Sequence, residues 1–188
     1  MNTPFALSLA TAAEATELSA LMRASFMAAY GHIAPLENLD RYQARAYAVD
    51  ALAHALAQGE IEIWVARDAQ GHPAGYVQIA TRAGAAPITG APAALELQRC
   101  YLRPAYFGSG AAALLMDRAK QRAGMFGAER LYLSVYQHAP RAIAFYRRQG
   151  LEVAAAVRFY IDEIGFDDWS MVCELGAKQP AARGHPQK

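Results

Sequence analysis

The feature that most constrains the fold of this chain is a strand signal that leads into a glycine-containing turn and then a helix. Residues 94–102 form a strand-like run that Pro104 stops, and from Ser109 onward apolar side chains recur with a helical period. Gly108 and Gly110 stand at the junction, where glycine lets the backbone adopt conformations barred to other residues. Because a helix begins with unpaired N–H groups and a partial positive charge, this arrangement is typical of a site for a phosphate-bearing cofactor.

Strand and helix signals are interleaved along the rest of the chain. Strands are expected at residues 5–9, 61–66, 75–80, 94–102, 131–136, 152–161 and 169–175. Helices are expected at residues 11–29, 39–57, from 109 onward and 140–150, with a loop at 84–92. This order predicts a layered α/β or α+β domain with a mixed sheet.

The length and composition favour one globular domain. The chain has 188 residues, of which 54% are hydrophobic, so residues 1–176 are expected to fold together and residues 177–188 to form a disordered tail. A formal net charge of +1 without a basic stripe argues against a nucleic-acid partner. No apolar run reaches the length of a membrane span, which argues against a membrane partner.

The cysteines and the amino terminus indicate the compartment. Cys100 and Cys173 lie in largely apolar runs, and no basic-then-apolar signal peptide precedes them. We interpret them as free thiols in a reducing cytoplasm. No spacing of His, Cys and Asp residues resembles a metal site, so no metal is expected.

Three segments carry a resemblance to a known family. They are Leu95-Glu96-Leu97-Gln98-Arg99-Cys100-Tyr101-Leu102-Arg103-Pro104, the turn Phe107-Gly108-Ser109-Gly110-Ala111-Ala112, and Ala142-Ile143-Ala144-Phe145-Tyr146 before Gly150. Together they resemble the GNAT N-acetyltransferase superfamily, and the element order matches it over roughly residues 5–175. The resemblance implies an α+β fold with a mixed, mostly antiparallel sheet of about seven strands, about four flanking helices and a splayed cofactor-binding cleft.

The same resemblance implies acetyl-CoA as co-substrate. Its pyrophosphate would lie on the turn and helix start, and its pantetheine amides would pair with the open edge of the preceding strand. The expected cofactor-binding residues are Cys100, Tyr101, Leu102, Phe107, Gly108, Ser109, Gly110, Ala111, Ala112, Ala139 and Tyr146. Two positions depart from the family pattern: Ala105 stands where Gln or Arg is usual, and Ala139 where Asn is usual. Ala139 removes a polar contact and a helix cap, typically worth ~1 kcal/mol.

Glu96 and Tyr146 are the candidate catalytic residues. An amine is protonated near neutral pH and must lose a proton before it attacks a thioester, and Glu96 is the carboxylate expected to accept that proton. Tyr146 is expected to protonate the departing thiolate during direct attack in a ternary complex. Other interpretations are a glutamate on the polar side of a strand, a core tyrosine, and Cys100 as a covalent carrier.

The family also implies where an acceptor binds, at the bend after the first helix and at a late hairpin. The expected lining side chains are Tyr30, His32, Trp64 and Tyr160. The segments Ser25-Phe26, Tyr30-Gly31-His32, Pro35, Phe159-Tyr160 and Asp167-Asp168 resemble bacterial spermidine/spermine acetyltransferase-like members. The clustered acids Asp162, Glu163, Asp167 and Asp168 either attract a polyamine or form a solvated turn. The expected acceptor is a primary amine, which is a polyamine, another small amine or a peptide amine.

Other functions stay open at this point. Ala105 and Ala139 are compatible with a CoA-binding sensor or interaction module that has little or no turnover. A nucleotide-binding α/β domain is a remote reading, because the turn lacks a phosphate-binding lysine. A late strand in this superfamily often joins a dimer, so a homodimer is a further expectation.

Overall fold

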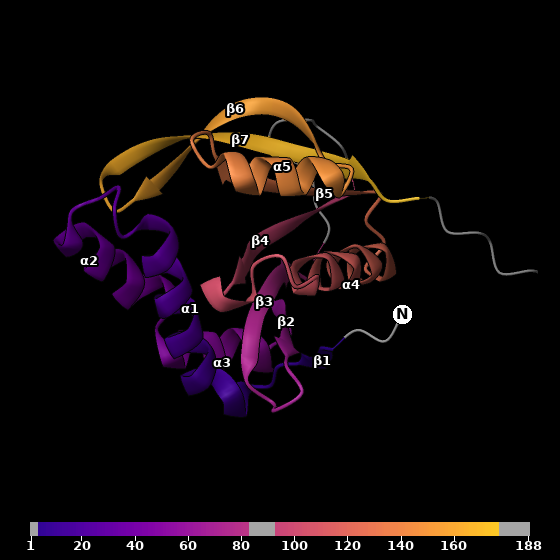
Figure 1. Ribbon diagram of the computed structural model, residues 1–188, viewed down its shortest axis with the longest axis horizontal. Coiled ribbons are helices and arrows are strands. Elements are labelled where there is room, and N and C mark those ends of the chain that lie inside the picture. Colours follow the sequence, from indigo (N-terminus) through magenta and orange to yellow (C-terminus); the bar gives the residue numbers. More distant parts are fainter. Residues whose placement is uncertain (1–3, 83–92, 177–188) are drawn as a thin grey trace, which may run out of the picture.

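A seven-stranded sheet lies at the centre of the computed structural model, which describes residues 4–82 and 93–176 (Figure 1). The strands are β1 (Ala6–Leu9), β2 (Ile61–Arg67), β3 (Pro73–Ala80), β4 (Ala94–Leu102), β5 (Arg130–Tyr136), β6 (Glu152–Ile161) and β7 (Ile164–Glu174). They run in the order β1-β2-β3-β4-β5-β7-β6, and only β4 and β5 pair in parallel. This confirms the predicted mixed, mostly antiparallel sheet. The loop predicted at 84–92 and the tail at 177–188 lie outside the described residues.

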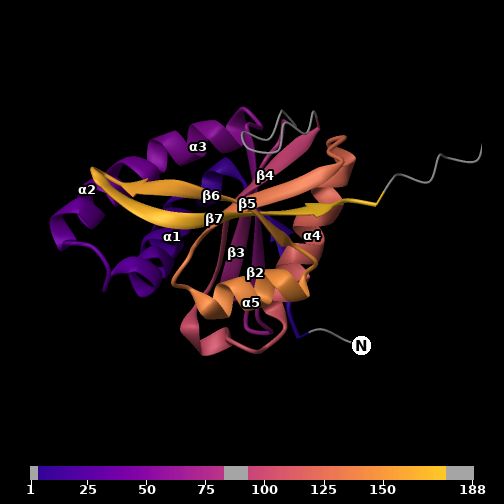
Figure 2. The ribbon, with the colours of Figure 1, turned by 90° about the horizontal axis from the view of Figure 1, so that it is seen from above.

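Helices cover both faces of the sheet. Those in the described residues are α1 (Ala15–Tyr30), α2 (Leu36–Ala46), α3 (Val49–Ala57), α4 (Ala111–Met125) and α5 (Pro140–Arg148), with 3₁₀ turns η1 (Ala12–Glu14) and η2 (Pro104–Tyr106). Helices α1, α2 and α3 lie on one face, and α4 and α5 lie on the other (Figures 1 and 2).

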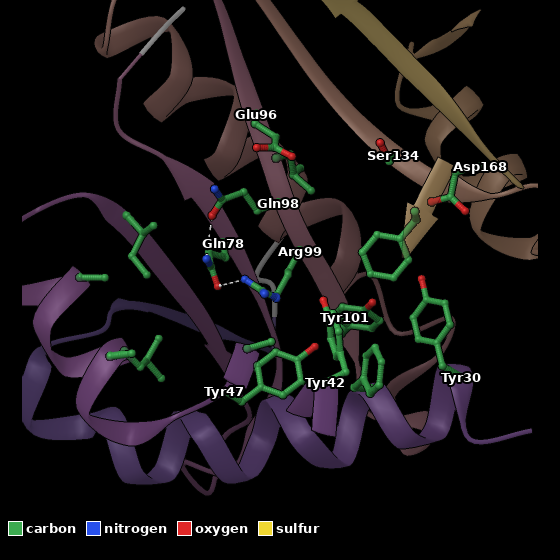
Figure 3. A pocket seen from close by; sticks show the side chains of 18 residues that line it. Tyr30, Tyr42, Tyr47, Gln78, Glu96, Gln98, Arg99, Tyr101, Ser134 and Asp168 are labelled. Carbon is green, nitrogen blue, oxygen red and sulfur yellow. Dashed lines mark hydrogen bonds between the residues drawn. The ribbon is translucent and has the colours of Figure 1, made fainter. Parts of the chain in front are cut away.

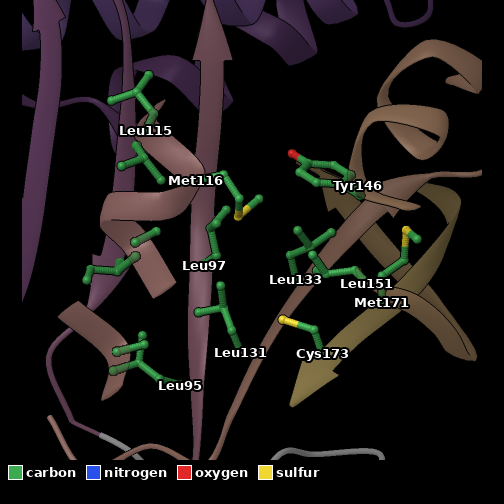
Figure 4. Packing of buried hydrophobic residues seen from close by; sticks show 14 of the residues in the cluster. Leu95, Leu97, Leu115, Met116, Leu131, Leu133, Tyr146, Leu151, Met171 and Cys173 are labelled. Atoms are coloured by element: carbon green, nitrogen blue, oxygen red, sulfur yellow. The ribbon is translucent and has the colours of Figure 1, made fainter. Parts of the chain in front are cut away.

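Two hydrophobic clusters hold these layers together. The first packs α4 and α5 against the sheet and includes Leu97, Leu115, Leu131 and Tyr146 (Figure 4). The second packs α1, α2 and α3 against the opposite face. Because side chains alternate along a strand, β2, β3 and β4 contribute residues to both clusters, which fixes the register of the central strands.

The single helix predicted at 39–57 is two helices. The chain leaves the helical conformation at Tyr47, whose side chain is only 1% exposed. The hydroxyl of Ser19 on α1 donates a 2.6 Å hydrogen bond to the Tyr47 carbonyl, which satisfies an acceptor released by the helix end. The break therefore depends on a contact with a distant helix that local periodicity does not report.

Strand β7 begins earlier than the prediction of residue 169. It starts at Ile164, directly after a tight turn in which Asp162 takes a positive φ of 56°. The acids Asp167 and Asp168 therefore lie within a paired strand and not in a loop. Alternation along that strand exposes Asp167 and buries Asp168.

Candidate active site

The parallel strands β4 and β5 separate shortly after they begin. They pair only over the first three residues of β4, ending at Glu96. From Leu97 to Leu102, β4 pairs on its other side with β3, so within the described residues its edge toward β5 has no strand partner. Main-chain N–H and C=O groups on such an edge can pair with an extended, amide-bearing molecule.

A β-bulge interrupts the pairing of β4 with β3 at Gln98. Gln78 of β3 faces Arg99, whereas the next residue, Ile79, faces Leu97. The extra residue turns Gln98 and Arg99 toward the same face of the sheet, where both line a cavity. The bulge thus determines which β4 side chains reach the cavity.

The N-terminus of α4 follows the open end of β4 through η2. Gly108 and Gly110 take positive φ values of 80° and 91°, a backbone conformation that favours glycine. Within residues 4–82 and 93–176, the N–H groups of Ala112 and Ala113 make no hydrogen bond, and Ser109 Oγ accepts only a long 3.4 Å bond from Ala111. This is a helix start whose donors are free for an anion.

A cation–aromatic pair joins the starts of α4 and α5. The Arg141 guanidinium lies 3.9 Å from the ring centroid of Phe107, whose side chain is 50% exposed. Ala139 is the N-cap residue of α5 and makes no side-chain capping bond, and Ala105 lies in η2. The backbone around both alanines keeps the conformation of a helix entry or turn despite the missing polar side chains.

Tyr146 projects from α5 toward β4 (Figure 4) and is 8% exposed. Burial, followed by the nearby Cys100 thiol and Tyr30 phenol, raises its pKa well above the usual value. Burial also raises the pKa of the Cys100 thiol to about 12. A thiol with that pKa is almost entirely protonated near neutral pH, so Cys100 is a poor nucleophile.

A cavity of about 470 Å³ opens between the sheet and the helices α1, α2 and α3 (Figure 3). Its polar lining is Tyr30, Tyr42, Tyr47, Gln78, Glu96, Gln98, Arg99, Tyr101, Ser134 and Asp168. Of the two expected catalytic residues, Glu96 lies in this lining, and Tyr146 approaches from the opposite face of the sheet. The cavity and Tyr146 thus lie on opposite faces of the sheet at the place where β4 and β5 separate.

Asp168 is a carboxyl group in the cavity lining whose pKa is strongly shifted. Its side chain comes from β7, the residue is 3% exposed, and Oδ1 has no hydrogen-bond partner within the described residues. Burial, followed by the charge of Asp167, raises its pKa from an ordinary value of about 4 to about 6. A carboxylate with such a pKa is ionised at neutral pH but binds a proton readily, as a general base requires.

Arg99 is held in the cavity by neutral groups. Its Nη1 donates a 2.9 Å hydrogen bond to Gln78 Oε1, and Gln78 Nε2 donates a 2.7 Å bond to Gln98 Oε1. The guanidinium carbon lies 5.1 Å from the ring centroid of Tyr47. Within the described residues, Arg99 takes part in no ion pair.

Of the four side chains expected to line an acceptor site, the cavity lining includes Tyr30 and does not include the other three. Tyr30 lies in the cavity, where burial raises its pKa to about 12 against the opposing effect of a hydrogen bond with Tyr101. Trp64 lies on the other face of the sheet, where the guanidinium carbon of Arg118 on α4 is 4.2 Å from the centroid of its ring. His32 is exposed in the turn after α1, and Tyr160 is 53% exposed.

Strand alternation explains why Trp64 and Tyr160 lie outside the cavity lining. The neighbours of Trp64 on β2, Ile63 and Val65, point toward the α1 side, so Trp64 must point away from it. On β6, Phe159 lines the cavity and Tyr160 therefore points outward. The alternation of apolar residues along β6, visible in the sequence, favours Phe159 over Tyr160 as the side chain that faces the cavity.

The acidic cluster of the late hairpin is largely neutralised by arginines. Asp162 accepts a 2.6 Å hydrogen bond from Arg41 of α2, and Asp167 accepts a 3.1 Å bond from Arg158. Glu163 is exposed, and only Asp168 faces the cavity. The pairing of Asp162 with Arg41 also ties the hairpin to α2 along one side of the cavity.

The part of the chain that the structure describes holds neither a metal cluster nor a membrane-spanning helix. No group of three or more His, Cys, Asp or Glu residues there has the arrangement of a metal site. None of the helices there combines the length and apolar character needed to cross a membrane. Cys100 and Cys173 are both free, and β5 separates their strands, as the predicted topology requires.

Comparison with known families and curated proteins identifies relatives by sequence. A model described as the acetyltransferase (GNAT) family matches residues 20–151. An uncharacterized N-acetyltransferase from Mycobacterium tuberculosis (strain ATCC 25618 / H37Rv) is 38% identical over 81 residues, which are 43% of this chain. A protein of the same description from Mycobacterium bovis matches to the same extent. The match spans about half, 52%, of the length of these relatives.

Solved structures share the fold at low sequence identity. The PaiA N-acetyltransferase from Thermoplasma acidophilum, in complex with coenzyme A, has a TM-score of 0.70 at 18% identity, covering 90% of this chain and 99% of that one. The spermidine N-acetyltransferase from Vibrio cholerae, in complex with CoA and spermine, has a TM-score of 0.66 at 18% identity, covering 93% and 97%. These similarities show that the arrangement of helices on both faces of a seven-stranded sheet is shared with known N-acetyltransferases.

Proposed function

This chain belongs to the acetyltransferase (GNAT) family, and we propose that it transfers an acetyl group from acetyl-CoA to a primary amine by direct attack in a ternary complex. The observation that carries the proposal is the meeting of three features around the separation of β4 from β5. The features are an open main-chain edge, a helix N-terminus with free donors, and a cavity that holds carboxylates. The first two suit the cofactor, and the third suits an amine.

Coenzyme A would be held mainly by backbone groups. Its pyrophosphate would accept hydrogen bonds from the N–H groups at the start of α4, where the helix dipole adds a partial positive charge. Its pantetheine amides would pair along the open edge of β4 as an added strand would, at Cys100 and Leu102. Backbone donors do not depend on the side chains at Ala105 and Ala139, so these alanines are compatible with cofactor binding.

Tyr146 would protonate the departing thiolate. Its raised pKa keeps the phenol protonated near neutral pH, so the proton is available when the thioester breaks. The raised pKa of the nearby Cys100 shows that this part of the protein disfavours a thiolate. A CoA thiolate released beside these groups would experience the same desolvation, and its own proton affinity would rise. Burial thus raises the proton affinity of both the phenol and the sulfur, so the shift of the sulfur offsets part of the shift of the phenol.

Asp168 is our candidate for the base that accepts the amine proton, and Glu96 is the alternative. Both carboxylates line the cavity, and only Asp168 combines a pKa near 6 with an oxygen that has no partner in the described residues. The amine nitrogen would lose its proton, form a bond to the thioester carbon and displace the sulfur. A backbone N–H on the open edge of β4 would stabilise the negative charge on the carbonyl oxygen. This reaction calls for no metal ion.

The test is acetyl transfer to a panel of amines, with free CoA thiol as the readout. The panel holds spermidine, lysine-containing peptides and small amines, and calorimetry with acetyl-CoA accompanies it. Turnover that falls about 10²-fold or more in Tyr146→Phe and in one of Asp168→Asn or Glu96→Gln would support the proposed roles. Binding of acetyl-CoA without turnover of any amine would favour a CoA-binding module, and absence of binding would contradict both functions.

We further propose a single domain over residues 1–176 in a cytoplasmic protein. The free state of Cys100 and Cys173 supports a reducing compartment. A homodimer through the edge strand β6 is also proposed, because much of that strand is exposed and it pairs only with β7 within the described residues. Light scattering coupled to size exclusion tests the dimer, and a monomer at micromolar concentration would contradict it.

A further inference from the structure

We infer that the acceptor is an amine that also carries a carboxylate, an amino-acid-like molecule whose carboxylate binds Arg99. This inference rests on the proposed acetyl transfer for the identity of the reacting amine. The structural basis is the distribution of charge in the cavity, where Arg99 stands on β4 and Asp168 stands on β7 (Figure 3).

Arg99 has the properties of a group that binds anions. A guanidinium carries five N–H donors and stays charged at physiological pH, whereas the groups that Arg99 meets within the described residues are neutral, namely Gln78 at 2.9 Å and the Tyr47 phenol. Charged groups removed from water are normally paired, because their desolvation is otherwise uncompensated. Gln78 and Tyr47 compensate part of that cost, and five donors are more than these two partners use, so donors remain for a carboxylate.

The orientation of Arg99 is fixed by a relay of amides. Gln98 accepts a hydrogen bond from Gln78, which in turn accepts one from Arg99. Gln78 is buried, so its amide cannot turn freely toward solvent. The bulge at Gln98 places this residue and Arg99 on the same face, which makes the relay possible. A guanidinium that is already oriented binds a planar carboxylate with little further loss of side-chain entropy.

The reactive end of the cavity lies beside Tyr101 and Tyr30. Tyr30 and Asp168, the proposed base, both line this end of the cavity (Figure 3). Arg99 is two residues before Tyr101 on the same strand, so the two side chains emerge about 7 Å apart along β4. Because Arg99 and Asp168 line one cavity, a molecule that fills it can present an amine to Asp168 and a carboxylate to Arg99.

A polyamine fits this charge pattern poorly. Its ammonium groups would meet Arg99 inside the cavity, where like charges are only weakly screened. Two acids of the late hairpin, Asp162 and Asp167, are already paired with arginines and so offer less attraction to a polyamine. A zwitterion instead places opposite charges against Asp168 and Arg99.

The first experiment compares amines that differ only in the carboxylate. Phenylalanine is paired with 2-phenylethylamine and methionine with 3-(methylthio)propylamine, and spermidine is included. We expect kcat/KM in the wild-type protein to be about 10- to 100-fold higher for the amino acids, the usual effect of a charge-assisted hydrogen bond. Wild-type preference for the decarboxylated amines or for spermidine would overturn the inference.

Arginine variants identify the group responsible. In Arg99→Gln we expect the KM of the amino acid to rise and that of the decarboxylated amine to stay level or fall, because a like charge is removed, so that the preference is lost, and in Arg99→Lys a partial preference to remain. Arg130→Gln removes an arginine paired with Glu174 at the far end of β5 and serves as the matched control. A preference that survives Arg99→Gln unchanged would overturn the assignment.

Binding of a carboxylate without an amine separates this inference from the proposed reaction. Calorimetry with 3-phenylpropionate in the presence of CoA requires no turnover. Binding to the wild-type protein and to Arg130→Gln, with a loss of about 10-fold or more in Arg99→Gln, would support the carboxylate site even if no amine were acetylated. Absence of binding to the wild-type protein would overturn the inference even if another amine were acetylated. Circular dichroism of each variant shows whether it is folded.

Discussion

Replacing Asp168 by asparagine is expected to make the protein more stable and less active at the same time. The carboxyl group is 3% exposed, one of its oxygens has no partner in the described residues, and its pKa is about 6. Since the unfolded chain would have a pKa near 4, the difference of about 2 units corresponds to about 3 kcal/mol at pH 8. The asparagine amide also lacks partners and retains part of this cost, so we expect a gain of about 1–3 kcal/mol.

The sign of the pH dependence follows from proton binding. Between about pH 4 and pH 6 the folded protein holds the Asp168 proton and the unfolded chain does not, so the stability of the wild type falls as the pH rises through this window. Urea unfolding at pH 8 should therefore show the full advantage of Asp168→Asn, and at pH 5 about half of it. Equal stability of the two proteins at pH 8, or a gap that does not change with pH, would refute this account of Asp168.

The activity of the same variant tests its proposed role. With Asp168 as the base, wild-type kcat/KM should decline as the pH falls below about 6, because the carboxylate becomes protonated. Asp168→Asn should lower kcat/KM by about 10²-fold, and Glu96→Gln is the matched exchange at the other carboxylate of the cavity. If an Asp168→Asn variant that remains active shows the same decline of kcat/KM at low pH, the titrating group is not Asp168.

Three further variants test other parts of the structure. Gly75→Ala would place a methyl group against the Tyr101 carbonyl oxygen, so the end of β4 should shift and calorimetry should show weaker CoA binding. Tyr146→Phe should lower kcat by about 10²-fold with CoA affinity unchanged, and a matching loss of affinity would indicate a packing role. Glu62→Gln keeps one oxygen as an acceptor but removes the negative charge that pairs with Arg122 of α4 across a 2.8 Å hydrogen bond, and should cost about 1–3 kcal/mol in urea unfolding at pH 7. Hydrogen bonds from Arg122 and Trp64 outweigh burial and lower the pKa of Glu62, so this cost should shrink below about pH 4.

The parts of the fold that sequence predicted well are those set by local chemistry. The strands at 94–102 and 152–161 were predicted at their observed bounds, because apolar alternation and a following proline or turn mark them directly. The left-handed backbone at Gly108 and Gly110 follows from the same kind of local signal. The order of strands and helices required no knowledge of long-range contacts.

The side chains of the cavity depend on contacts between distant segments. Arg99 enters it because a bulge forms against β3, and Tyr47 lies beneath it because a contact with Ser19 accompanies the end of α2. The sequence predicts Asp168 in an acidic turn, but β7 extends across this segment and pairs it within the sheet. The sequence contains no marker of the bulge or of the extended β7, so it does not predict that Arg99 and Asp168 line the same cavity.

The most direct test of the central claim is a crystal structure of the protein with coenzyme A. The account predicts that the pyrophosphate accepts hydrogen bonds from the N–H groups at the start of α4, and that the pantetheine arm runs along the open edge of β4. The sulfur atom should then lie between that edge and the Tyr146 hydroxyl. Coenzyme A bound away from β4 and α4, or a sulfur atom out of reach of Tyr146 and of the cavity, would contradict the account.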